Sequence, residues 1–169
     1  MTAVFIHGQD SSSRGVKGLW FKEHYPDMLV PDFTGTLHER MDTLTTLLAG
    51  QEKLVLIGSS FGGLMAAIFT LEHESRVKKV ILLAPALNFP DYSSYLERQT
   101  QVPARLFIGR QDDICPPDIV ITAARRTFTN IVIHRSDDDH LLKATFQEID
   151  WQRLLAVGAT TFPSEPFPD

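Results

Sequence analysis

The sequence predicts an α/β protein, a three-layer sandwich in which helices cover both faces of a mostly parallel sheet of about six strands. Two observations support this fold class. Short apolar runs alternate along the chain with longer segments whose apolar residues recur at helical spacing. Most of the short runs are apolar throughout, which is typical of strands that are buried on both faces of a parallel sheet.

Six segments are expected to form strands, because each is a short, mainly apolar run that ends in a polar or glycine-containing loop. In the second of these segments Pro31 lacks an amide hydrogen, so this strand is expected at an edge of the sheet or in an irregular position. The expected strands are residues 3–6, 28–33, 54–57, 80–84, 105–108 and 131–133.

Four helices are expected between these strands. The first begins near Val16, and the second repeats apolar residues at helical spacing from Leu37 onward, with Gly50 as a suitable C-terminal cap. The third helix follows the strand at 54–57 directly. Pro116-Pro117-Asp118 opens the fourth, because proline and aspartate suit the first turn of a helix.

The end of the chain is expected to close the domain. Thr145-Phe146-Gln147-Glu148 has the pattern of a capping box, which predicts a last helix that runs to Gly158. We find no internal repeat and no linker, so residues 1–162 are interpreted as a single domain. Residues 163–169 are rich in proline and are interpreted as an extended tail.

The overall composition excludes several classes of function. With 43% hydrophobic and 22% charged residues, the sequence is that of an ordinary globular protein. A net charge of −5 argues against binding to nucleic acid or to an anionic membrane surface. No run approaches the roughly 20 apolar residues of a membrane span. The single cysteine, Cys115, permits no internal disulfide, so we expect a reducing, cytoplasmic location.

The most informative stretch is Gly58-Ser59-Ser60-Phe61-Gly62, which fits the pattern G-x-S-x-G. An expected buried strand precedes it and an amphipathic helix follows, so the stretch is interpreted as a nucleophile elbow with Ser60 at its apex. The crowded turn favours glycine two positions before and two after the apex, which excludes Ser59 as the apical residue. A phosphate-binding loop is the rival interpretation, but no G-K-[ST] follows the glycines.

A serine hydroxyl needs a base and an orienting acid before it can act as a nucleophile. Residues that follow parallel strands meet at one edge of the sheet, where ligands bind. His7, Ser60, Asp112 and His140 each follow an expected strand and should therefore lie along that edge. His140 is the candidate base, whereas His134, inside the last strand, is interpreted as structural.

The candidate acid is Asp112, with its neighbour Asp113 interpreted as solvated. The acidic run 137–139 beside His140 is interpreted as a hydrated loop. A metal site there is the alternative, but no spacing of ligands supports it, so we expect no metal and no other cofactor. For the oxyanion, the backbone amide of Phe61 is one expected donor and that of Gln9 is the other. A plain tight loop is the alternative interpretation for His7-Gly8.

The order along the chain of Ser60, Asp112 and His140 resembles that of the alpha/beta-hydrolase fold family. The segments 5–8 and 109–116 are similar to the oxyanion loop and the acid loop of that family. The resemblance covers residues 3–158 and is closest to small, lidless bacterial serine esterases. We expect a minimal alpha/beta-hydrolase core without a cap domain, because only residues 86–103 separate the expected strand that ends at Pro85 from the next one. The sequence departs from the family pattern by lacking two N-terminal strands, and Gln9 stands where many relatives carry an apolar residue.

These features together predict a serine hydrolase that cleaves a small carboxylic ester or thioester through an acyl-enzyme. A peptidase or acyltransferase with the same residues is one alternative, and a non-catalytic binding protein on the same scaffold is another. No motif specifies an oligomeric state. The side chains that are candidates for an acyl pocket, with ordinary packing as the alternative for each, are Met65, Phe89, Tyr92 and Tyr95.

Overall fold

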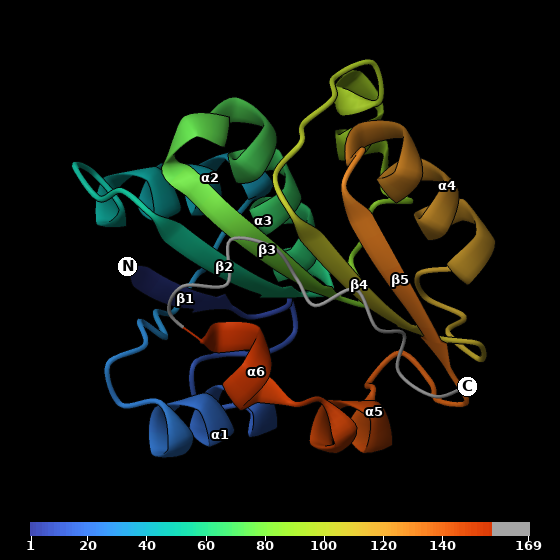
Figure 1. The fold of residues 1–169 in the computed structure, drawn as a ribbon, viewed down its shortest axis with the longest axis horizontal. Helices are drawn as coiled ribbons and strands as arrows, with labels where there is room; N and C mark the ends of the chain where they lie inside the picture. The colour runs from blue at the N-terminus through green and yellow to red at the C-terminus, as the bar shows by residue number, and fades with distance from the viewer. Residues whose placement is uncertain (157–169) are drawn as a thin grey trace.

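A computed structural model describes residues 1–156 and has a central sheet of five strands (Figure 1). All neighbouring strands run parallel, and their order in the sheet follows their order in the sequence. The predicted α/β class and parallel sheet are therefore confirmed. The strands are β1 (Thr2–Ile6), β2 (Leu54–Ser59), β3 (Val77–Leu83), β4 (Ala104–Gly109) and β5 (Ile131–Ser136).

Helices form a layer on each face of the sheet, which gives the expected three-layer sandwich (Figure 1). Two short 3₁₀ helices, η1 (Glu74–Arg76) and η2 (Pro90–Tyr95), precede and follow β3. Within residues 1–156, no helix has the length and apolar character that crossing a bilayer requires. One layer holds α1 (Val16–His24), α5 (Lys143–Glu148) and α6 (Trp151–Leu155), and the other holds α2 (Leu37–Leu47), α3 (Phe61–Glu72) and α4 (Pro117–Thr127).

The apolar strands contribute side chains to two hydrophobic cores, one on each face of the sheet. In β2, Leu54 and Leu56 pack into the core beneath α2, α3 and α4, whereas Val55 and Ile57 pack into the core beneath α1, α5 and α6. Successive side chains of a strand point to opposite faces, so a strand covered on both faces needs an apolar residue at every position. This explains why the runs in the sequence are apolar throughout rather than alternating.

The strand predicted at residues 28–33 is not formed, so the sheet has five strands instead of about six. Only Leu29 pairs with β1, in an isolated bridge to Val4. The Leu29 amide donates to the Ala3 carbonyl, and the Leu29 carbonyl accepts from Phe5. Pro31, two residues later, has no amide hydrogen with which to continue the ladder, and the chain leaves the sheet there.

The closing helix is also divided. The chain forms α5 and α6 as two short helices, and the predicted capping box at Thr145 does not form, because Thr145 lies inside α5. A capping box is present instead at the start of α2, where the Thr36 side chain accepts from the Glu39 amide and the Glu39 carboxylate accepts from the Thr36 amide. Gly158 and the predicted tail at 163–169 lie outside the described residues.

Candidate active site

Ser60 forms the turn between β2 and α3, because β2 ends at Ser59 and α3 begins at Phe61. Its backbone has φ 55° and ψ −116°, a conformation that costs a residue with a side chain roughly 1–3 kcal/mol. The turn also brings backbone segments very close together. A Cβ atom on Gly58 would lie 2.2 Å from the Gly62 carbonyl oxygen, and one on Gly62 would lie 2.0 Å from the Ile6 carbonyl oxygen. The spacing of the two glycines around Ser60 is therefore a steric requirement of this turn.

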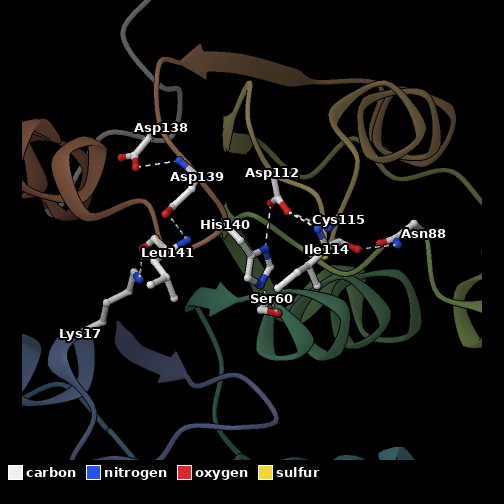
Figure 2. Close-up of polar contacts among 10 residues, drawn as sticks. All are labelled: Lys17, Ser60, Asn88, Asp112, Ile114, Cys115, Asp138, Asp139, His140 and Leu141. Carbon is white, nitrogen blue, oxygen red and sulfur yellow. Dashed lines mark hydrogen bonds and ion pairs between the residues drawn. The ribbon is translucent and has the colours of Figure 1, made fainter.

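His140 lies 80 residues further along the chain, in the loop after β5, and its side chain reaches Ser60 (Figure 2). The distance from Ser60 Oγ to His140 Nε2 is 2.9 Å. The loop is held at both sides of the histidine. The Leu141 amide donates to the Asp139 carboxylate at 2.8 Å, and Lys17 Nζ, from α1, donates to the Leu141 carbonyl at 2.6 Å.

The acidic run before His140 shapes this loop more than the sequence indicates. The Asp138 carboxylate accepts hydrogen bonds from the Thr145 amide and hydroxyl, both at 2.9 Å, so it ties the loop to α5. Partial burial is the largest single influence on the pKa of Asp138, and it acts to raise the pKa. The bonds from Thr145, together with one from the Asp139 amide, outweigh burial and lower the pKa. Two of the three acidic side chains interpreted as a hydrated loop therefore hold the histidine loop in shape.

Asp112 completes the chain of hydrogen bonds that starts at Ser60 (Figure 2). It follows β4, its side chain is buried, and His140 Nδ1 lies 2.8 Å from its Oδ2. Its other oxygen, Oδ1, accepts from the backbone amides of Ile114 at 3.0 Å and Cys115 at 2.7 Å. These two amides fix the carboxylate, so that Oδ2 faces the imidazole. Asp113 is exposed.

The two residues expected to bind an oxyanion with their amides both line the pocket beside Ser60. Phe61 is the first residue of α3, so its amide has no intrahelical acceptor. Among the hydrogen bonds of residues 1–156, none is donated by the Gln9 amide. The loop that carries Gln9 is held by His7, whose Nε2 accepts from the Phe33 amide at 2.9 Å. The ring hydrogen of His7 is therefore on Nδ1, which donates to the Gly8 carbonyl at 2.7 Å.

A pocket of about 400 Å³ lies beside Ser60 and His140. Of the four side chains predicted for an acyl pocket, Phe89 lines this space, whereas the other three lie elsewhere. Met65 is fully buried in the core under α3, the Tyr92 hydroxyl pairs with Thr127 in the interior, and the Tyr95 hydroxyl donates to Glu72. Two further apolar side chains that line the pocket, Ile114 and Leu141, are each about half exposed.

Within the described residues, one group has the spacing of metal ligands: Asp112, Cys115 and His140 place ligand atoms within 4.8 Å of one another. Two of these residues are already bonded to each other, and both carboxylate oxygens of Asp112 have donors. Burial and the nearby carboxylate raise the pKa of the Cys115 thiol to about 12, whereas a metal takes a thiolate. The chemistry of these residues therefore favours the hydrogen-bonded arrangement over a metal site.

His134 lies in β5 and packs against neighbouring side chains, as expected for a structural histidine in the last strand. Its ring stacks on Phe107 with centroids 4.6 Å apart, and its Nε2 accepts from Arg105 Nη1 at 3.1 Å. Burial, aided by the positive charge of Arg105, lowers the pKa of His134 to about 4. The folded protein therefore keeps this imidazole neutral in a range where the unfolded chain protonates it.

This difference predicts a pH dependence of stability. Between about pH 6.5, the ordinary pKa of histidine, and pH 4 the unfolded chain binds more protons at His134, so the free energy of unfolding should fall as the pH falls. We expect His134→Gln to flatten the dependence in this window. Urea denaturation of both proteins at several pH values measures it, and parallel curves for the two proteins would contradict the prediction.

A model of the alpha/beta hydrolase fold family matches residues 8–99, more than half of the sequence. The chain belongs to the alpha/beta hydrolase family. No protein with a curated description matches this alpha/beta hydrolase significantly. The family membership confirms the resemblance that was based on Ser60, Asp112 and His140. Of these three residues, Ser60 lies within the matched region.

Several solved structures are similar to this alpha/beta hydrolase. Alpha/beta hydrolase domain-containing protein 10 from mouse is 17% identical, with 87% of this chain and 85% of that chain covered and a TM-score of 0.72. An esterase from Pyrococcus furiosus is 17% identical, with 87% and 77% covered and a TM-score of 0.68. The carboxylesterase CesB from Bacillus subtilis is 17% identical, with 91% and 82% covered and a TM-score of 0.64. At these identities the likeness shows the fold alone.

Sequence reasoning missed three side chains that shape the site of this alpha/beta hydrolase. Lys17 reaches the histidine loop across 124 residues of sequence, a separation at which no local pattern gives a signal. Asp138 is expected in a hydrated loop, but it accepts hydrogen bonds from Thr145, and the sequence gives no pattern that links the two residues. Arg40, in the first turns of α2, contacts the loop that carries Gln9. The capping-box pattern that begins at Thr36 was a readable signal for the start of this helix.

Proposed function

We propose that this alpha/beta hydrolase is a serine hydrolase that cleaves carboxylic esters or thioesters through an acyl-enzyme. One observation supports the proposal above all others, the continuous chain of hydrogen bonds from Ser60 through His140 to Asp112. Its two links, at 2.9 and 2.8 Å, have the geometry that nucleophilic catalysis by serine requires. The three residues come from loops that follow three different strands, so the arrangement depends on the whole fold.

In the proposed reaction Ser60 Oγ attacks the acyl carbon, and His140 Nε2 takes the hydroxyl proton as the new bond forms. Asp112 holds His140 Nδ1–H and stabilises the imidazolium that results. The carbonyl oxygen of the substrate becomes negative and accepts hydrogen bonds from the Gln9 and Phe61 amides. His140 then gives its proton to the departing alcohol or thiol, and water releases the acyl group from Ser60 by the same steps.

The site suits small substrates. The segment between β3 and β4, where a cap domain would be inserted, contains only the 3₁₀ helix η2 and its flanking loops. The pocket beside Ser60 measures about 400 Å³, which is near the lower end of the range for ligand sites. Apolar side chains such as Phe89 and Leu141 line it beside the serine. The single cysteine of the sequence supports a reducing, cytoplasmic setting for this activity.

A combined labelling and substrate experiment tests the proposal. A fluorophosphonate probe should label the protein at Ser60, as located by peptide mass spectrometry, because only an activated serine reacts readily. The same protein should hydrolyse p-nitrophenyl acetate and an acetyl thioester, with an initial burst of product that matches the enzyme concentration. The corresponding anilide should react far more slowly.

Other outcomes would select another function. Absence of labelling together with absence of turnover on all three substrates would indicate a binding protein on the same scaffold. Faster cleavage of the anilide than of the ester would indicate a peptidase. Transfer of the acetyl group to an added alcohol in preference to water would indicate an acyltransferase.

A further inference from the structure

Arg40 is a buried charged side chain that contacts both segments expected to bind the oxyanion. It is only 4% exposed. Its Nη2 donates to the Gln9 carbonyl at 3.4 Å, and its guanidinium carbon lies 5.4 Å from the centre of the Phe61 ring. Its Nε donates to the Gly35 carbonyl at 3.1 Å, which anchors the side chain to its own helix start. A single guanidinium thus connects α2 to both candidate amide donors.

Burying this charge carries a cost that packing alone does not explain. Burial lowers the pKa of Arg40, while Asp10 opposes the effect, and a guanidinium stays protonated throughout the physiological range. Within the described residues Nη1 is buried and has no hydrogen-bond partner. Even a buried ion pair can often be replaced by apolar residues of similar volume without loss of stability. Arg40 has a buried charge and an unpartnered Nη1, so filling space alone does not explain an arginine at this position.

The placement of Arg40 is determined by the segment that precedes it. The capping box of Thr36 and Glu39 fixes the first turn of α2, and the Arg40 amide donates to the Thr36 carbonyl at 3.0 Å in that turn. The same segment begins at Phe33, whose amide donates to His7 at the base of the Gln9 loop. Residues 33–40 therefore hold this loop at two points, through the His7 ring and through the Arg40 guanidinium.

We propose that Arg40 is a positioning residue that acts through Gln9 and Phe61 on the oxyanion of the reaction, an inference that rests on the proposed hydrolase function. By holding the Gln9 carbonyl, it fixes the backbone of the residue whose amide is the proposed second donor to the oxyanion. Its positive charge lies against the two segments that donate to the oxyanion, in surroundings of low dielectric constant where such a charge acts strongly. Arg40 therefore favours the transition state more than the bound substrate.

Arg40→Met and Arg40→Lys test this role, with Arg76→Met as the matched control. Arg76 also lies over a phenylalanine ring, Phe69 at 5.5 Å, and it also donates to backbone carbonyls, among them that of Gln51 at 3.0 Å. It contacts the C-terminal end of α2, whereas Arg40 lies near the N-terminal end. The control therefore removes an arginine with similar contacts at the opposite end of α2; Arg76 is less buried than Arg40 and also pairs with Glu52.

In Arg40→Met we expect kcat on p-nitrophenyl acetate to fall about tenfold to a hundredfold with KM nearly unchanged, less than the loss of a direct oxyanion donor. Affinity for a trifluoromethyl ketone, which mimics the tetrahedral intermediate, should fall by the same factor as kcat/KM. Arg40→Lys, which keeps the charge, should recover part of the loss. Arg76→Met should lower the melting temperature and leave kcat and inhibitor affinity unchanged.

Three results would overturn the inference while leaving the proposed function intact. One is an Arg40→Met protein with wild-type kcat and inhibitor affinity, which would leave Arg40 a packing residue. Another is a parallel loss of kcat in Arg40→Met and Arg76→Met, which would reflect general destabilisation. If Arg40→Met does not fold, the neutral variant Arg40→Gln is measured instead, and wild-type kcat and inhibitor affinity in that protein would be the third result. A wild-type protein without turnover or fluorophosphonate labelling would instead overturn the proposed function, and this inference with it.

Discussion

Ser60→Ala is expected to fold and to lose about 10⁴-fold or more in kcat on an activated ester. The substitution removes only the hydroxyl oxygen that lies 2.9 Å from His140 Nε2. It keeps the Cβ atom, so the strained backbone at φ 55° is no worse for alanine than for serine. The measurement is steady-state hydrolysis of p-nitrophenyl acetate, with circular dichroism to show that the melting temperature is retained. The residual rate should show no burst of product.

Ser59→Ala is the control for this experiment. Ser59 is the last residue of β2 and precedes the elbow serine, but no hydrogen bond joins it to His140 in the described part of the chain. Its replacement should therefore cost far less activity than that of Ser60. Retention of most of the activity in Ser60→Ala, or the larger loss in Ser59→Ala, would assign the nucleophile to another residue.

Asp112→Asn is expected to lower kcat by about 10⁴-fold while the fold is kept. The backbone amides of Ile114 and Cys115 donate to Oδ1 of Asp112, so they will hold the carbonyl oxygen of an asparagine in that place. Its NH₂ group must then face His140 Nδ1 and donate to it. That contact favours the imidazole tautomer with hydrogen on Nε2, which cannot accept the Ser60 proton. The structure thus predicts a large loss from the exchange of one atom.

Asp113→Asn provides the comparison on the neighbouring residue. Asp113 is exposed and is not in contact with the imidazole. We therefore expect the kcat of the Asp113→Asn protein to stay close to that of the wild type. Both variants are measured on the same ester, and the rate of fluorophosphonate labelling of Ser60 is followed in parallel. A larger loss of kcat in Asp113→Asn than in Asp112→Asn would assign the acid to Asp113.

The residues of the hydrogen-bonded chain could be chosen from the sequence because each follows a strand. Parallel strands bring their carboxyl ends to one edge of the sheet, so Ser60, Asp112 and His140 were expected together before any distance was known. Asp112 and Asp113 follow the same strand, and because two adjacent loop residues rarely both face one imidazole, only one of them is expected to be the acid. The structure agrees, with one carboxylate buried against the imidazole and the other exposed.

The pocket was much harder to predict than the hydrogen-bonded chain. Met65 has the helical spacing of a residue near Phe61, but that spacing places it equally well in the core, where it lies. Tyr92 and Tyr95 are close to Phe89 in sequence, yet only Phe89 lines the pocket, since the hydroxyls of the tyrosines bond to Thr127 and Glu72. Irregular segments have no period from which the direction of a side chain can be inferred.

The amino-acid sequence alone predicts the parallel sheet, the tight turn at Ser60 and the order in which Ser60, Asp112 and His140 follow their strands. These features arise from local steric rules and from the repeat of apolar residues, which neighbouring positions of the chain already contain. The folded structure was needed to show that the chain leaves the sheet after Leu29, that Lys17 and Asp138 hold the histidine loop and that Arg40 lies against the Gln9 loop. Such contacts join segments far apart in sequence, and they exist only once packing has brought those segments together.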